Sequence, residues 1–474
     1  MQRQQPESPQ VNRDQSGYFS VATIFALASG VGGAISVVRI SGPETRAVLK
    51  VLTGRPDWEP KLAKLCRLKT SAGAAIDEAL VIYFEGPRSF TGEDVAELHL
   101  HSSPYILRTV FDELRHLGCR SALAGEFSFR AVRNGKMSIS QAKAVADLIA
   151  SESRPAAELA LEKLSGSQNQ LLGKIASDLR RITVLSEVGI DFSDQDVEEV
   201  SLPTLKRSLS ELQKVLQVLK SSFERGGRIQ DGVTVSLIGL PNAGKSSFFN
   251  ALLGEDRSIV SDIPGTTRDI VRERLVLESE GLSVSFRLSD TAGVRPTEDE
   301  IEKIGVERSI RAARGADLIL WVLDGSDRSP DSQMALLKHW EELGSPSGRS
   351  VGILTKSDIE GNAFNNRSFF EGRMPFVVCS SLSGDGMDEA AALMVRTCGH
   401  WVARSSGEVV LTREEDLRSV EEALEHIGRA LLSPEEDLFA SDLKLALRSL
   451  STLIGDTVPD DILGAIFSGF CIGK

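Results

Sequence analysis

GLPNAGKSS, at residues 239–247, decides the fold of the central part of this chain. The stretch follows an apolar run, VTVSLI, and leads into KSSFFNALL, which has the composition of a helix. Gly239 and Gly244 let backbone N–H groups face an anion, and the N-terminus of the following helix adds the positive end of its dipole. A strand, a loop and a helix in this order are typical of a phosphate-binding loop, in which Lys245 contacts the outer phosphates and Ser246 binds magnesium.

The sequence on the C-terminal side of this loop continues the same pattern. Apolar runs alternate with helical stretches, and the runs are TVSLIG, LSVSFRLSD, DLILWVLD, SVGILT and PFVVCS. This alternation predicts a doubly wound parallel sheet with helices on both faces. We place the resulting nucleotide-binding domain at residues 229–397.

Helical sequence flanks this domain on both sides. Residues 135–228 contain leucines at four-three-four-three spacing, which predicts a seam between packed helices: Leu205, Leu209, Leu212, Leu216 and Leu219. The pairs Gly226-Gly227 and Asp231-Gly232 are expected to mark the boundary with the next domain. Residues 398–474 are helical again and end on FCIGK. The two parts are expected to form one discontinuous all-α domain into which the nucleotide-binding domain is inserted.

The N-terminal region differs from the rest of the chain in composition and in its pattern of strand-like and helix-like runs. Residues 1–18 are polar and rich in Gln and Pro, so a disordered tail is predicted. In residues 19–134, strand-like runs such as ISVVRISG and VAELHLH alternate with helix-like runs, which predicts a compact α/β domain. The fold class is therefore a multidomain α/β protein.

Composition is that of a soluble globular protein. The chain has 474 residues, of which 41% are hydrophobic and 26% charged. It has no apolar run of the ~18 residues that a membrane span needs and no signal-peptide pattern, so we expect a cytoplasmic protein without a membrane partner. The lack of an arginine-rich leader favours a bacterial host over a mitochondrion.

Charge and cysteine content restrict the possible partners. The net charge of −13 tends to repel nucleic acid, so a role in binding RNA would require a locally basic face. The five cysteines are scattered without C-x-x-C spacing, at Cys66, Cys119, Cys379, Cys398 and Cys471. An odd, scattered set argues against a disulfide framework and a zinc site.

Two further segments complete the phosphate side of the site. Asp290-Thr291-Ala292-Gly293 follows the run SVSFRLS, where the carboxylate reaches the magnesium shell and the glycine N–H senses the γ-phosphate. Thr267, in the loop GTTRD, is placed to complete that shell when a triphosphate is bound. A hydroxyl-rich turn is the alternative interpretation of that loop taken alone.

The base is read by residues after the run SVGIL. A buried Asp358 would accept hydrogen bonds from N1–H and the 2-amino group of guanine, whereas adenine would leave its carboxylate unpaired. The usual guanine motif begins with Asn, but here Thr355 precedes Lys356, which predicts a weaker link between base and phosphate loop. The second base-side loop, Ser380-Ser381-Leu382, also departs from the usual pattern, because its middle residue is normally Ala.

Hydrolysis requires a group that orients water and a charge that stabilises the transition state. Val294 occupies the position after DTAG where a water-orienting Gln is common, so another residue must serve. Asn242 offers a neutral oxygen that could hold potassium in place of an arginine finger. Glu302 could orient the water, although spacing alone favours a solvated helix carboxylate.

Several of these segments together resemble the MnmE (TrmE) family of tRNA-modification GTPases, from about Phe19 to Lys474. The segments are GLPNAGKSS, IPGTTRD, DTAGVR with DEIEKIGVER, SFTGEDVAELHLH, GEFSFRAVRNGK with QAKAVADLIAS, and FCIGK. The resemblance implies a homodimer with an N-terminal tetrahydrofolate-binding domain, a discontinuous helical domain and an inserted G domain. It also implies an FAD-containing partner, MnmG, with which the protein builds a carboxymethylaminomethyl group on wobble uridine of tRNA.

The resemblance assigns roles to individual residues. Potassium ligands would be Asn242, Ser261, Ile263 and Thr266, magnesium ligands Ser246 and Thr267, and Glu302 would be the water-orienting acid. GTP would be bound by Asn242, Ala243, Gly244, Lys245, Ser246, Ser247, Ser261, Asp262, Ile263, Pro264, Gly265, Thr266, Thr267, Asp290, Thr291, Ala292, Gly293, Thr355, Lys356, Asp358, Ser380, Ser381 and Leu382.

The resemblance also implies a site for 5,10-methylenetetrahydrofolate, or for 5-formyltetrahydrofolate as its analogue. Its contacts would be Arg39, Glu97, Lys136 and Lys474, although each residue alone would be explained by a surface ion pair. HSSP at residues 101–104 departs from the family's His-Gly-Gly-Pro, which puts close backbone approach there in doubt. Cys471 is a candidate nucleophile, and burial in an apolar segment is its alternative.

The leading hypothesis is thus a potassium-activated GTPase that gates folate-dependent modification of tRNA. A regulatory GTPase of the ribosome-assembly kind would share the G domain but would lack the region 19–134 and the FCIGK terminus. A folate enzyme with an independent GTPase appended is the other rival.

Overall fold

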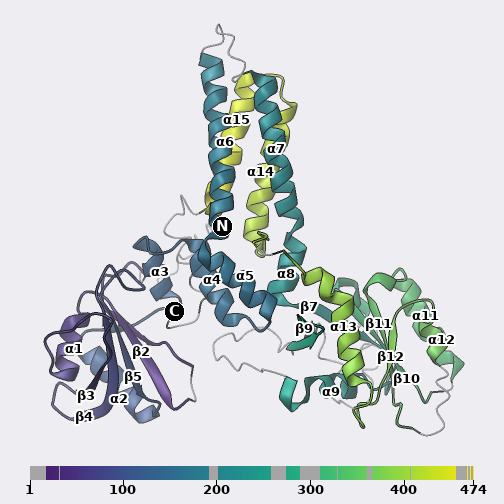
Figure 1. Cartoon of the computed structure of the whole chain (residues 1–474), viewed down its shortest axis with the longest axis horizontal. Helices are drawn as coiled ribbons and strands as arrows, with labels where there is room; N and C mark the ends of the chain where they lie inside the picture. The colour runs from purple at the N-terminus through teal and green to yellow at the C-terminus, as the bar shows by residue number, and fades with distance from the viewer. Residues whose placement is uncertain are drawn as a thin grey trace, which may run out of the picture. The chain divides into compact units, whose positions relative to one another are not determined.

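The computed structural model of the chain is shown in Figure 1. It describes residues 18–30, 33–191, 201–257, 274–288, 310–327, 329–359, 366–405 and 407–454, together with Phe467, Phe470 and Gly473. The chain divides into two compact units, one of residues 1–146 with 455–474 and one of residues 147–454.

The first unit is built on a sheet whose strand order is β3-β4-β5-β2-β1-β6. The strands are β1 (Ile24–Leu27), β2 (Ile35–Ser41), β3 (Lys64–Lys69), β4 (Ala75–Phe84), β5 (Val95–His101) and β6 (Arg120–Ser121). Helices α1 (Thr45–Thr53) and α2 (Pro104–His116) bury one face of it, against alternate residues such as Val38, Val81 and Leu98. The other face carries the intervening residues of each strand.

The last described residues of the chain belong to this first unit. Phe467 stacks edge-on against Phe129 of α3 (Glu126–Arg133), with ring centroids 5.7 Å apart. A Cβ on Gly473 would lie 2.1 Å from the carbonyl oxygen of Leu27, so only glycine fits at that position beside β1. Phe467 and Gly473 therefore pack against elements of the N-terminal domain.

The second unit contains a helical bundle formed from both flanking regions. Figure 1 shows α6 (Ser167–Asp191) and α7 (Leu202–Ser221) beside α14 (Glu414–Leu432) and α15 (Glu436–Ile454). All five leucines of the predicted seam on α7 are buried, in one core with residues of the other three helices. This confirms the discontinuous helical domain. The remaining helices of the region are α4 (Ile139–Ala150), α5 (Arg154–Ser165) and α8 (Phe223–Asp231).

Of the two glycine-containing pairs predicted to mark the domain boundary, Gly226-Gly227 lies inside α8, and Gly232 of the second pair follows the last residue of that helix. A Cβ on Gly226 would lie 1.9 Å from the carbonyl oxygen of Leu411. Glycine is needed there for close packing between α8 and the segment that returns from the inserted domain. The domain boundaries otherwise stay predictions.

The inserted domain has the strand order β12-β11-β10-β7-β9-β8. Its strands are β7 (Val233–Ile238), β8 (Arg274–Ser279), β9 (Leu282–Leu288), β10 (Leu318–Asp324), β11 (Ser350–Thr355) and β12 (Phe376–Val378). All neighbours pair in parallel except β8, which is antiparallel to β9. Glu280 and Gly281 both have positive φ, as a tight two-residue hairpin requires. The sheet predicted as wholly parallel thus has one antiparallel edge strand.

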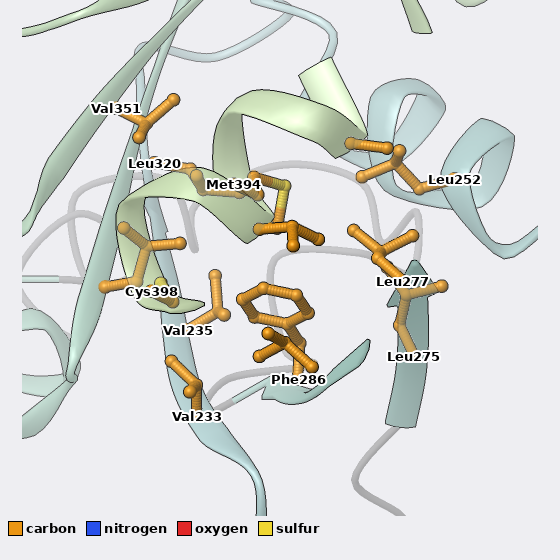
Figure 2. Packing of buried hydrophobic residues seen from close by; sticks show 14 of the residues in the cluster. Val233, Val235, Leu252, Leu275, Leu277, Phe286, Leu320, Val351, Met394 and Cys398 are labelled. Carbon is orange, nitrogen blue, oxygen red and sulfur yellow. The ribbon is translucent and has the colours of Figure 1, made fainter. Parts of the chain in front are cut away.

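Helices cover both faces of this sheet, which confirms the doubly wound architecture. On one face, Met394 and Cys398 of α13 (Met387–Val402) pack with Val235 and Phe286 in the cluster of Figure 2. α9 (Lys245–Arg257) contributes Leu252 to the same cluster. On the other face, a cluster around Trp321 includes residues of α11 (Pro330–Glu342) and α12 (Arg367–Phe370).

Among the described residues, no helix is both long and apolar enough to cross a membrane. The four described cysteines, Cys66, Cys119, Cys379 and Cys398, are buried free thiols. Burial raises the pKa of Cys119 to about 11 and that of Cys379 to about 12, so these two thiols are unreactive near neutral pH.

Candidate functional site

The predicted phosphate loop lies between β7, which ends at Ile238, and α9, which begins at Lys245. Asn242 has a φ of 61° and Gly244 a φ of 88°, so the loop turns through two left-handed residues. A Cβ on Gly239 would lie 2.3 Å from the carbonyl oxygen of Val322 on β10. The loop is therefore held directly against the neighbouring strand, and only glycine permits that approach.

Lys245 bends back over this loop. Its Nζ donates to the carbonyl oxygens of Gly239 and Leu240, both at 2.8 Å. The ammonium charge is thereby kept at the loop whose N–H groups would face a nucleotide's phosphates, and phosphate oxygens can compete for it. Ser246 follows in the first turn of α9, as a magnesium-binding hydroxyl in this type of loop does.

Thr355 connects the predicted base-binding motif to the predicted phosphate loop. Its buried Oγ1 lies 2.7 Å from the carbonyl oxygen of Ala243 and 3.0 Å from that of Leu323. The sequence predicts a weaker link where Thr replaces Asn, and the structure shows that a direct contact to the loop persists. A Cβ on Gly244 would lie 3.3 Å from the same hydroxyl, so the two segments are closely packed.

Lys356 pairs with an acid at the end of the neighbouring strand. Its Nζ lies 2.6 Å from Oδ2 of Asp324, and its φ is 60°. Burial raises the pKa of the Asp324 carboxyl, but hydrogen bonds from Lys356 and Ser326 outweigh it and leave that pKa below its usual value. The carboxylate therefore stays charged at neutral pH and holds the lysine in place within the predicted base-binding motif.

Asp358 is brought together with the second base-side loop. The Ser380 hydroxyl donates to its Oδ1 at 2.5 Å and accepts from the backbone N–H groups of Leu382 and Ser383. The expectation of a buried Asp358 is wrong: the residue is exposed, because it lies in the turn after β11 at the carboxyl edge of the sheet. Ser380 is buried, whereas 87% of Leu382 is exposed.

Part of the predicted nucleotide site lies outside the described residues. This holds for the loop from Ser261 to Thr267, for Asp290, Thr291, Ala292 and Gly293, and for Glu302. Their assignments to GTP, magnesium, potassium and water stay predictions. The same applies to Cys471 and Lys474 in the first unit, although their neighbours Phe470 and Gly473 lie beside α3 and β1.

In the first unit, the structure brings two predicted folate residues together. Arg39 on β2 and Glu97 on β5 are directly opposite in the sheet. Arg39 donates from Nε at 3.1 Å and from Nη2 at 2.9 Å, and both bonds end on Glu97 Oε1. The guanidinium also lies 5.5 Å from the ring centroid of Phe90 and 5.8 Å from that of Phe127. Two rings and a carboxylate therefore fix its position.

Lys136 lies at the loop of residues 86–93 that also carries Phe90. Its Nζ donates to the carbonyl oxygen of Pro87 at 2.9 Å, and its Cγ would lie 3.2 Å from a Cβ on Gly92. This lysine is therefore beside the loop that packs on Arg39.

Ser102 and Ser103, which replace the two glycines of His-Gly-Gly-Pro, fit into the structure without backbone strain. The Ser36 hydroxyl donates to Ser102 Oγ at 2.8 Å, and Ser103 has extended backbone that any residue adopts. Neither serine has a positive φ.

Sequence reasoning missed three residues around this pair: Phe90, Phe127 and His99. The two phenylalanines are far from Arg39 in sequence, and no local pattern indicates that they stack on it. His99 could have been found, because it is two residues from Glu97 on a strand and therefore on the same face.

Comparisons with known proteins agree over nearly the whole chain. A family model described as "MnmE helical domain" matches residues 139–471, and one described as "GTP-binding protein TrmE N-terminus" matches residues 23–136. A "tRNA modification GTPase MnmE" of Azoarcus sp. (strain BH72) is 39% identical over 453 residues, which cover 95% of this chain and 98% of the relative. The proteins of that name from Neisseria meningitidis serogroup C (strain FAM18) and Stutzerimonas stutzeri are 35% and 37% identical and cover 96% and 95% of this chain, and 99% of each relative.

Proposed function

The chain belongs to the MnmE (TrmE) family of tRNA-modification GTPases, and from this premise we propose how its GTP hydrolysis is activated and used. The chain is a GTP hydrolase that acts in tRNA modification. In our proposal, potassium activates hydrolysis, and the cycle gates the use of a folate one-carbon unit. With an FAD-containing partner, MnmG, a homodimer of this chain forms the 5-carboxymethylaminomethyl or aminomethyl group on wobble uridine of tRNA.

One observation supports the proposed coupling between GTP hydrolysis and the helical domain: both ends of the G domain connect to that same domain. At the entry, Arg228 of α8 donates to Asp317 Oδ1 at 2.7 Å, and Oδ2 of the same carboxylate accepts from the backbone N–H of Thr234 on β7. At the exit, Arg404 donates to Glu162 of α5 at 2.6 Å. Ordering of loops by the γ-phosphate would thus be passed to the helices through these partly buried ion pairs.

The residues of the phosphate loop suit the proposed cations. Asn242 is exposed at the left-handed turn of the loop, so its amide oxygen is available as a ligand, with Ser261, Ile263 and Thr266 as proposed co-ligands. Ser246 and Thr267 would hold magnesium. When bound, potassium would supply the positive charge that an arginine finger supplies in other GTPases. Glu302 would orient water, a task that Val294 cannot perform.

The proposed activation predicts that GTP turnover depends on the alkali ion. Replacing potassium by sodium at constant ionic strength is expected to lower kcat on the order of tenfold to a hundredfold, because a misplaced charge stabilises the transition state poorly. In the Asn242→Ala variant, kcat in potassium and kcat in sodium are expected to be nearly equal. Steady-state phosphate release measures both effects, and equal wild-type turnover in the two salts contradicts potassium activation.

The proposed folate site consists of Arg39, Glu97, Lys136 and Lys474, with 5,10-methylenetetrahydrofolate as donor and Cys471 as a candidate nucleophile. The Arg39–Glu97 pair supports it, since a carboxylate can accept hydrogen bonds from a pterin's amino-pyrimidine edge. A regulatory ribosome-assembly GTPase without modification chemistry is the alternative. The first unit and its contact with the FCIGK terminus favour modification chemistry.

A further inference from the structure

His99 has a ring nitrogen, Nε2, to which the proposed folate site assigns no role. It lies on β5 two residues after Glu97, on the face of the sheet opposite the helix-covered core. Its Nε2 is buried and has no hydrogen-bond partner among the described residues. A buried ring nitrogen without a partner is unfavourable in a folded protein, and such groups are commonly satisfied by a ligand or another bound molecule.

The neighbours of His99 in the sheet cannot satisfy this atom. The residues directly opposite are Val37 on β2 and Leu80 on β4, and neither side chain can form a hydrogen bond. The Oε2 atom of Glu97 lies 3.6 Å from Nε2, which is beyond ordinary hydrogen-bond length. Both bonds from Arg39 end on Oε1 of the same carboxylate. Oε2 and the imidazole nitrogen are therefore neighbouring polar atoms on this face of the sheet, and neither receives a hydrogen bond from Arg39.

We propose that His99 is a specificity-determining residue that reads the 4-oxo group of a reduced folate beside Glu97. The pyrimidine edge of a pterin presents the 2-amino group and N3–H as donors, followed by the 4-oxo group as an acceptor. Glu97 Oε2 accepts from the donors, and the Nε2–H group of the His99 imidazole donates to the 4-oxo oxygen. Arg39, held between Phe90 and Phe127, keeps the carboxylate in place.

This assignment rests on the proposed folate function and makes a separate prediction. A 4-amino analogue presents a donor where folate presents an acceptor, so His99 disfavours it. We expect His99→Leu to weaken the binding of 5-formyltetrahydrofolate on the order of tenfold, because one hydrogen bond to the ligand is lost. Binding of the 4-amino counterpart of the same compound is expected to be unchanged or tighter.

The experiment is isothermal titration calorimetry of the full-length protein with both compounds. His99→Gln keeps an N–H donor and is expected to retain the wild-type preference for the 4-oxo compound. His101→Leu is the matched control, since His101 lies on the same face of β5 but pairs with Asp77 and is 71% exposed. It is expected to bind both compounds as the wild type does. Thermal unfolding and GTP turnover verify that each variant is folded.

The outcomes separate the two hypotheses. If the wild type binds neither compound, the folate function itself is wrong. If the wild type binds the 4-oxo compound and the ratio of the two affinities stays the same in His99→Leu, the assignment to His99 is overturned. Loss of the preference in a folded His99→Gln protein contradicts it as well.

Discussion

Asp358→Asn is expected to change the nucleotide preference of this enzyme from guanine to xanthine. The Asp358 carboxylate follows β11 and is oriented by the hydroxyl of Ser380 at 2.5 Å. As a carboxylate it can only accept hydrogen bonds, and guanine supplies two donors, N1–H and the 2-amino group. An amide offers a donor that clashes with the 2-amino group but pairs with the 2-oxo group of xanthine. We expect kcat/KM for GTP to fall on the order of 10⁴-fold and turnover of XTP to appear.

The measurement is phosphate release from GTP, XTP and ATP by wild type and variant at subsaturating nucleotide. ATP turnover is expected to stay negligible in both, because neither side chain matches adenine. A variant that loses GTP turnover without gaining XTP turnover would show that Asp358 supports the loop and does not read the base. Ser380→Ala, which removes the orienting hydroxyl, is expected to weaken GTP binding without creating a preference for XTP.

Gly239→Ala is expected to abolish productive nucleotide binding, with kcat/KM for GTP lower by on the order of 10²- to 10³-fold. The added methyl would lie 2.3 Å from the carbonyl oxygen of Val322, a separation that no real Cβ adopts. Val322 is fully buried in the middle of β10, so the loop must move and not the strand. A displacement of about 1 Å in groups that position phosphates is enough for a loss of this size.

Gly315→Ala provides the matched control in the same domain. A Cβ there would meet nothing within 4 Å, and wild-type turnover and nucleotide affinity are expected. Affinity for a fluorescent GDP analogue and phosphate release measure both variants. Wild-type affinity in Gly239→Ala would mean that the loop does not depend on its contact with β10.

The sequence is most informative where a pattern and a local geometry coincide. The strand, loop and helix around residues 239–247 were predicted from glycine positions and apolar periodicity, and β7 and α9 lie on either side of the loop as expected. The leucine spacing of α7 likewise predicts the buried seam that joins the two halves of the bundle. In both cases neighbours in sequence determine the structure.

Contacts between distant segments could not be predicted in this way. Glycine is needed at position 226 because of the Leu411 carbonyl, which lies far away in sequence, and no local pattern indicates that contact. The antiparallel edge strand β8 was missed, because its run RLVLES is short and is separated from β9 only by a tight turn. The contact that Thr355 makes could not be predicted for a similar reason: whether its hydroxyl reaches Ala243 depends on how closely β11 lies to the phosphate loop.

The candidate folate site also combines residues assigned from the sequence with contacts that only the folded structure shows. Arg39 and Glu97 were assigned from a family resemblance, and only strand register places them side by side. The aromatic rings on Arg39 and the buried nitrogen of His99 are properties of the folded sheet. No single-sequence pattern contains them.

The central claim is that GTP turnover by this chain drives modification of wobble uridine, and one measurement tests it most directly. Nucleosides from tRNA of cells that lack the gene are analysed by mass spectrometry, with the wild type, Gly315→Ala or Gly239→Ala supplied in its place. The account predicts that the 5-carboxymethylaminomethyl and aminomethyl uridines disappear without the gene and return with the first two proteins only. Unchanged nucleosides without the gene, or full modification with a Gly239→Ala protein that does not turn over GTP, would contradict it.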